Sequence, residues 1–263
     1  MSSVGVGAGV GVEQDGNVTI VTIDRPEVSN AVDRTTAAAL VAAFESFDAD
    51  PDSSVAVLAG SGGTFCSGAD LSALGTDRGN RVSLDPTDPG PMGPTRMQLS
   101  KPVIAAVEGH AVAGGLELAI WCDLRVAAAD ATFGVYCRRW GVPLIDGGTV
   151  RLPRLIGGSR ATDMILSGRS VDAAEAERIG LVNRICESGD ARRVAVELAH
   201  QIAAFPQVCV RSDLASTHAQ WGHDEADALM IEVELGLRTA TSAETRSGVA
   251  RFVGGEGRHG EGV

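Results

Sequence analysis

One carboxyl group lies inside an apolar segment of the chain, and its spacing from two glycines suggests acid–base chemistry. Gly114 and Gly115 follow a strand-like run at Val103–Val107 and open a predicted helix that carries Glu117. A helix N-terminus presents unpaired N–H groups and a partial positive charge, and glycine lets a ligand oxygen approach them. Because Glu117 lies three residues after Gly114, both lie on the same helix face. This arrangement suits proton transfer beside a polarised carbonyl group.

The same residues also allow a purely structural interpretation. The two glycines can serve only for close helix–strand packing, and Glu117 can belong to a structural ion pair. The neighbours of Glu117 are apolar, so a buried carboxyl group with a raised pKa is expected there. Perturbed carboxyl groups gather at functional sites, but structural ion pairs perturb pKa values as well, so the pattern leaves both roles open.

A second glycine-rich segment follows a strand-like run at Ser54–Ala59. Its Phe65–Asp70 part predicts a tight turn with exposed backbone amides. Together with Lys101–Arg125, this segment resembles the enoyl-CoA hydratase/isomerase family, also called the crotonase family. The resemblance covers about Val18 to Arg258 and includes three further segments: Asp24–Ala31, Gly141–Thr149 and Leu152–Gly157.

The resemblance implies an enzyme that binds an acyl-CoA thioester and stabilises its enolate. By this match, the oxyanion amides fall on Ala69 and Gly114. Glu117 corresponds to the first catalytic glutamate of the hydratases, which holds or deprotonates the water that adds to a 2-enoyl-CoA. The residues expected around the CoA-bearing substrate are Glu27, Val28, Ala31, Asp70, Leu71, Gly115 and Cys137. We expect no metal, and no cofactor beyond the coenzyme A that the substrate carries.

The sequence departs from the two-glutamate hydratases at Cys137. In those enzymes a second glutamate lies four residues after the phenylalanine of a Phe-Gly pair, and here Phe133 puts a thiol at that place. A thiol has an ordinary pKa of about 8.5 and is a poor substitute for a carboxylic acid. Asp146 is the nearest carboxyl group on the adjoining segment, either as an acid or base or as a helix N-cap. Enoyl-CoA hydration is the first expectation, with isomerisation, hydrolysis or non-catalytic acyl-CoA binding as alternatives.

The pattern along the chain predicts an α/β fold, and by the resemblance a crotonase-like spiral of strand-strand-helix turns with a C-terminal helical region. We expect a flexible N-terminal tail at 1–12, a spiral core with the acyl-CoA site at 13–189, a helical oligomerisation region at 190–253 and a flexible tail at 254–263. The family forms trimers, often paired into hexamers. The helix expected at Asp224–Thr239 carries apolar residues at helical spacing, for contact between subunits or for packing on its own core.

Composition narrows the possible partners. The chain has 263 residues, 44% of them hydrophobic, and a formal net charge of −12, which disfavours nucleic acids and anionic membrane surfaces. Five widely spaced cysteines and five scattered histidines predict neither a disulfide framework nor a zinc site. No apolar run reaches the length of a membrane span, and Met1–Val12 lacks the basic start of a signal peptide. We expect a cytoplasmic protein whose partners are an acyl-CoA thioester and its own copies, as a homotrimer or hexamer.

Overall fold

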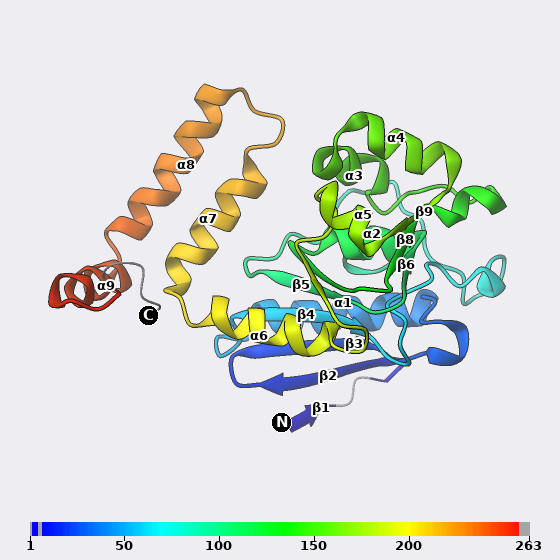
Figure 1. Ribbon diagram of the computed structural model, residues 1–263, viewed down its shortest axis with the longest axis horizontal. Helices are drawn as coiled ribbons and strands as arrows, with labels where there is room; N and C mark the ends of the chain where they lie inside the picture. Colours follow the sequence, from blue (N-terminus) through cyan, green and yellow to red (C-terminus); the bar gives the residue numbers. More distant parts are fainter. Residues whose placement is uncertain (1, 5–6, 258–263) are drawn as a thin grey trace.

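The computed structural model describes residues 2–4 and 7–257, which form a spiral core and a projecting helical arm (Figure 1). Seven strands of this part of the chain form one sheet in the order β1-β2-β3-β4-β5-β7-β10. Three more strands form a smaller sheet in the order β6-β8-β9. The strands are β1 Ser2–Val4, β2 Val10–Asp15, β3 Val18–Ile23, β4 Val55–Gly60, β5 Val103–Val107, β6 His110–Val112, β7 Leu124–Ala128, β8 Thr132–Gly134, β9 Ser170–Asp172 and β10 Arg184–Cys186.

The central strands are parallel and buried, which explains why their sequences read as unbroken apolar runs. Helix α6 (Ala191–Ala203) packs against β3, β4, β5 and β7, and α1 (Arg34–Ala49) packs against β2 and β3. The turn of the spiral that matters for the site runs from β5 through β6 into α2 (Gly114–Trp121). The core therefore fixes both ends of the short segment that leads into the Gly114 helix.

The remaining helices cover one end of the core and build the arm. The remaining α-helices are α3 Gly148–Ile156, α4 Gly158–Ser167, α5 Ala173–Arg178, α7 Gln207–Ala219, α8 Glu225–Ala240 and α9 Ala243–Gly254. Short 3-10 helices are η1 Pro26–Val28, η2 Leu71–Ala73, η3 Pro94–Arg96 and η4 Tyr136–Trp140. Figure 1 shows α7 and α8 side by side, leading away from the sheet, with α9 at the far end. Within the described ranges no helix has both the length and the apolar character needed to cross a bilayer.

The predicted α/β spiral with a helical C-terminal region is confirmed, but the N-terminal boundary differs from the expectation. A flexible tail was expected at 1–12, whereas Ser2–Val4 pairs with β2 and Val10 already belongs to β2. Val10 is buried because β2 pairs antiparallel with β3 and lays its apolar side on the core. Glycines between the valines had hidden this alternation. At the other end α9 continues through Gly254, and residues 258–263 of the expected C-terminal tail lie outside the described residues.

Candidate active site

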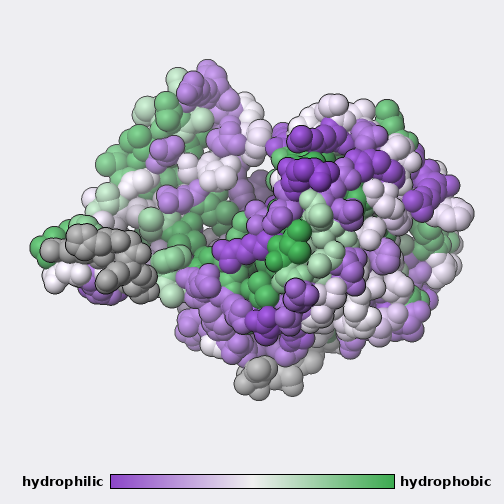
Figure 2. Space-filling model, in the orientation of Figure 1, coloured by the Kyte–Doolittle hydropathy of each residue, from purple (hydrophilic) through white to green (hydrophobic). Residues whose placement is uncertain are grey.

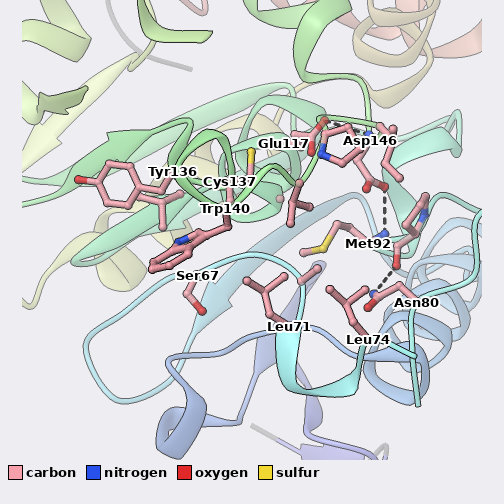
Figure 3. Close-up of a pocket in the computed structure, with 18 of the residues that line it drawn as sticks. Ser67, Leu71, Leu74, Asn80, Met92, Glu117, Tyr136, Cys137, Trp140 and Asp146 are labelled. Carbon is pink, nitrogen blue, oxygen red and sulfur yellow. Dashed lines mark hydrogen bonds between the residues drawn. The ribbon is translucent and has the colours of Figure 1, made fainter. Parts of the chain in front are cut away.

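A cavity of about 300 Å³ lies between α2, the 136–146 segment and the segment that runs from Ser67 to Met92 (Figure 3). Four of the predicted catalytic positions line it: Ala69, Gly114, Glu117 and Asp146. Leu71 and Cys137, expected near the CoA-bearing substrate, line it as well. Most of its other lining side chains are apolar. The spiral thus brings residues from distant parts of the chain to one cavity.

Two backbone amides in the cavity wall have no acceptor among the residues that the structure describes. Within the part of the chain that the structure describes, neither the Ala69 nor the Gly114 N–H group donates a backbone hydrogen bond. The residues beside Ala69 are paired: Val32 N–H donates to Gly68 O at 2.8 Å, and Asp70 N–H donates to Val32 O at 2.9 Å. The Ala69 N–H group therefore points away from Val32, to which Gly68 and Asp70 are hydrogen-bonded. A Cβ on Gly68 would lie 2.9 Å from Gly114 N, so the two segments touch and bring both amides to one place.

The start of α2 is held in an unusual backbone conformation. Ala113, the N-cap, has φ +53° and ψ −125°, which is strained for a residue with a side chain. Its N–H donates to Gly134 O at 2.9 Å, so β8 holds it in place. A Cβ on Gly115 would overlap the carbonyl oxygen of Cys66. Gly115 therefore allows the two cavity-forming segments to pack together, and it is not part of the cavity lining.

Glu117 is 2% exposed, and its two carboxylate oxygens have different surroundings. Oε1 accepts hydrogen bonds from Asp146 N at 2.9 Å and Gly148 N at 2.8 Å, at the start of α3. Oε2 accepts none from the described residues. Burial raises the pKa of Glu117 from 4.5 to about 7, aided by the charge of Asp146 and opposed by the two N–H groups. A carboxyl group with such a pKa can both take and return a proton near neutral pH.

Asp146 fastens the far wall of the cavity. Its side chain turns away from Glu117, and Oδ1 accepts a hydrogen bond from Met92 N at 2.9 Å (Figure 3). Oδ1 also accepts a hydrogen bond from the Thr95 hydroxyl. Burial raises the pKa of Asp146. The N-cap of α3 is Gly147, without a side-chain cap, so the N-cap prediction for Asp146 is wrong. Its role as acid or base stays a prediction.

Cys137 lines the same cavity from η4 and is buried. Burial raises the pKa of its thiol, and the charge of Glu117 raises it further. The group is therefore a neutral thiol at physiological pH. It lies near the acid without replacing a second carboxylate.

Comparison with known proteins now adds to this geometry. A family model described as enoyl-CoA hydratase/isomerase matches residues 13–259. The chain belongs to the enoyl-CoA hydratase/isomerase family. Enoyl-CoA hydratase EchA19 of Mycobacterium tuberculosis is 35% identical over 96% of both chains. Mevalonyl-coenzyme A hydratase sidH of Aspergillus fumigatus is also 35% identical, over 94% of this chain and 87% of its own. A solved enoyl-CoA hydratase from M. tuberculosis superposes with a TM-score of 0.88 at 35% identity and covers 94% of this chain and 96% of its own.

Several positions that the family resemblance assigned to CoA contacts lie outside the cavity. Glu27 and Val28 are exposed in η1, whereas Ala31 and Asp70 are buried. Asp70 accepts a hydrogen bond from Arg25 at 3.2 Å, within a cluster of charged side chains that joins η1 to η2. Its observed contacts hold the loop that presents the Ala69 amide.

The sequence indicates that acyl length and branching depend on the loop Leu74–Pro94, and this loop contributes Leu74, Val82 and Met92 to the cavity. The sequence interpretation missed the cavity residues Tyr136, Trp140 and Ile145, which carry no catalytic chemistry. They lie in η4 and its continuation, where hydrophobic periodicity is absent. The one available signal was Trp140 in an otherwise polar and glycine-containing stretch, Arg138–Gly141.

Proposed function

We propose that this family member adds water to the double bond of a 2-enoyl-CoA. One observation carries the proposal: the Ala69 and Gly114 amides, which have no acceptor in the described part of the chain, share an apolar cavity with the buried carboxyl group of Glu117. The amides suit a thioester oxygen that gains negative charge, and the carboxyl group suits proton transfer at the carbons beside it. Loss of one such amide typically costs about 3–4 kcal/mol of transition-state stabilisation.

The reaction needs only these groups and one water molecule. Ionised Glu117 takes a proton from water while the water oxygen bonds to C3, and the electrons of the C2=C3 bond move onto the thioester oxygen. The two amides stabilise the resulting enolate. Glu117 then returns the proton to C2, which completes the addition of H and OH and regenerates the carboxylate. Because the Cys137 thiol stays neutral and is a weak acid, we assign both proton steps to Glu117.

Isomerisation of a 3-enoyl-CoA is a second candidate. The observation in its favour is that Asp146, also with a raised pKa, lines the same cavity as Glu117. Two carboxyl groups beside one acyl chain can remove a proton from C2 and deliver one to C4, which moves the double bond from C3=C4 to C2=C3 without adding water. Oδ2 of Asp146 accepts no hydrogen bond from the described residues and is available for this step.

The test is turnover of crotonyl-CoA and 3-hexenoyl-CoA by the purified protein and by its Glu117→Gln variant. We expect hydration of crotonyl-CoA by the wild type and none by the variant, since an amide cannot carry the proton. Titration with butyryl-CoA, which has no double bond, should show binding by both proteins. Conversion of 3-hexenoyl-CoA without hydration of crotonyl-CoA would support isomerisation instead. Tight butyryl-CoA binding without any turnover would indicate a non-catalytic acyl-CoA protein.

We also propose that the arm formed by α7, α8 and α9 joins copies of this chain into a trimer or hexamer. Helix α8 exposes Leu229, Met230, Val233 and Leu237. Figure 2 shows apolar residues along this arm, where the core does not cover them. A second copy would remove this surface from water. Light scattering should give three or six times the chain mass, and a monomer at micromolar concentration would contradict this proposal.

A further inference from the structure

Large apolar side chains gather at the mouth of the cavity although water reaches them. Among the described residues before α6, ten large hydrophobic side chains are exposed, and five of these line this one cavity. The five are Leu71, Leu74, Val82, Trp140 and Ile145. Trp140 is 73% exposed, which is a costly state for the largest side chain of the group. Such a concentration points to an apolar occupant.

This apolar mouth, which we define as Leu74, Val82, Trp140 and Ile145, is continuous with the reaction centre. Ile145 directly precedes Asp146, whose N–H holds Glu117. A Cβ on Gly114 would lie 2.7 Å from Met92 Sδ. The segment that contains both Val82 and Met92 therefore reaches the Gly114 amide. Figure 3 shows Leu74 and Trp140 around the space into which Glu117 and Met92 project. An acyl group bound at the amides therefore reaches the mouth.

Most hydrogen-bonding groups of the polar side chains near the mouth are engaged with the protein. The Asn80 amide nitrogen donates to Val32 O at 3.1 Å and to Pro91 O at 2.7 Å, and only its buried Oδ1 has no partner among the described residues. The Tyr136 hydroxyl is paired with the Ser170 hydroxyl at 2.6 Å. The pantetheine arm of CoA carries two amides that need hydrogen-bonding partners, and this wall offers few. A hydrocarbon group matches it better.

We propose that the apolar mouth binds the acyl group and that the substrate is an enoyl-CoA with an acyl group longer or wider than crotonyl. This inference rests on the proposed function. Trp140 is the specificity-determining residue, because it has the largest apolar side chain at the mouth. Each methylene that moves from water into this wall contributes about fourfold to binding. A medium-chain or ring-bearing 2-enoyl group covers the mouth, whereas crotonyl leaves it in water.

The test compares kcat/KM for crotonyl-, 2-hexenoyl- and 2-decenoyl-CoA in the wild type and in Trp140→Ala. We expect the wild type to prefer 2-decenoyl-CoA over crotonyl-CoA by at least about tenfold. Trp140→Ala should lower kcat/KM by about tenfold for 2-decenoyl-CoA and by less than about threefold for crotonyl-CoA. Val82→Ser, on the opposite wall, should show the same dependence on length.

Leu84→Ala is the matched control, because Leu84 lies in the same loop as Val82, is fully exposed and does not line the cavity. It should leave every kcat/KM unchanged. An equal loss for all three substrates in Trp140→Ala would overturn the inference, and a changed mass in light scattering would then assign Trp140 to a subunit contact. If no substrate is hydrated, titration with butyryl- and decanoyl-CoA decides the inference separately. Tighter binding of decanoyl-CoA supports the apolar mouth while contradicting hydration, and equal binding contradicts the apolar mouth.

Discussion

Replacement of Glu117 by glutamine should abolish turnover and stabilise the protein at the same time. The amide keeps an oxygen that can accept from Asp146 N and Gly148 N, as Oε1 does now. It removes a carboxylate that burial makes costly to ionise. The acid that we propose for catalysis is therefore also a source of instability above neutral pH.

The size of this effect follows from the pKa of Glu117. The folded protein keeps the proton up to a pH of about 7, whereas the unfolded chain releases it near 4.5. Between these values the folded state binds more protons, so stability is greatest below 4.5 and falls as the pH rises towards 7. Each pH unit in this window changes the free energy of unfolding by about 1.4 kcal/mol, which gives about 3 kcal/mol in all.

Urea unfolding at several pH values, followed by circular dichroism, measures this difference. The free energy of unfolding of Glu117→Gln minus that of the wild type should rise by about 3 kcal/mol between pH 4.5 and pH 8. The amide N–H₂ group needs an acceptor, so the variant can start about 1–2 kcal/mol below the wild type at low pH. The prediction concerns the change of this free-energy difference with pH, and it does not depend on the difference at low pH. A difference that stays constant with pH would refute the claim that Glu117 is desolvated.

Three further outcomes test the site. Gly148→Ala puts a Cβ 2.9 Å from Glu117 Oε1 and should lower kcat more than tenfold, with little change in KM, in steady-state assays. Ala69→Pro deletes one amide donor and should lower kcat by about 10²–10³ while butyryl-CoA binding persists; unchanged turnover in a folded variant would exclude the amide from catalysis. Asp146→Asn keeps an oxygen for Met92 N, so thermal unfolding should move little; a large fall in rate then assigns proton transfer to Asp146, and an unchanged rate assigns it to holding the loop alone.

The fold was largely predictable because its strands and helices differ in hydrophobic pattern. Runs such as Ser54–Ala59 and Val103–Val107 are apolar almost throughout because parallel strands are covered on both faces. Strand β2 was missed, because its glycine breaks an alternation that only pairing with β3 makes visible. The three-residue strands β6 and β8 were missed because they are too short to show a period.

The chemistry of the site was easier to predict than its walls. Gly114 and Glu117 are close in sequence, so helix geometry alone relates them. The contact between Gly68 and Gly114 depends on a chain crossing that no local pattern contains. The contacts of Asp146 with Met92 and Thr95 join residues more than 50 positions apart, so the sequence suggested a local cap instead.

As a single residue, Asp146 connects the proposed acyl-binding loop to Glu117, the acid of the proposed reaction. Its backbone N–H holds Glu117, while its side chain holds the loop segment around Met92. A Cβ on Gly90 would lie 2.6 Å from Asp146 Oδ1, so even a small side chain there would disturb this link. Attempts to retarget the protein by recombining loops should therefore keep residues 90–95 with their own 145–148 segment. Libraries that randomise Leu74–Val82 alone should retain more active members than libraries that extend the variation to Thr95.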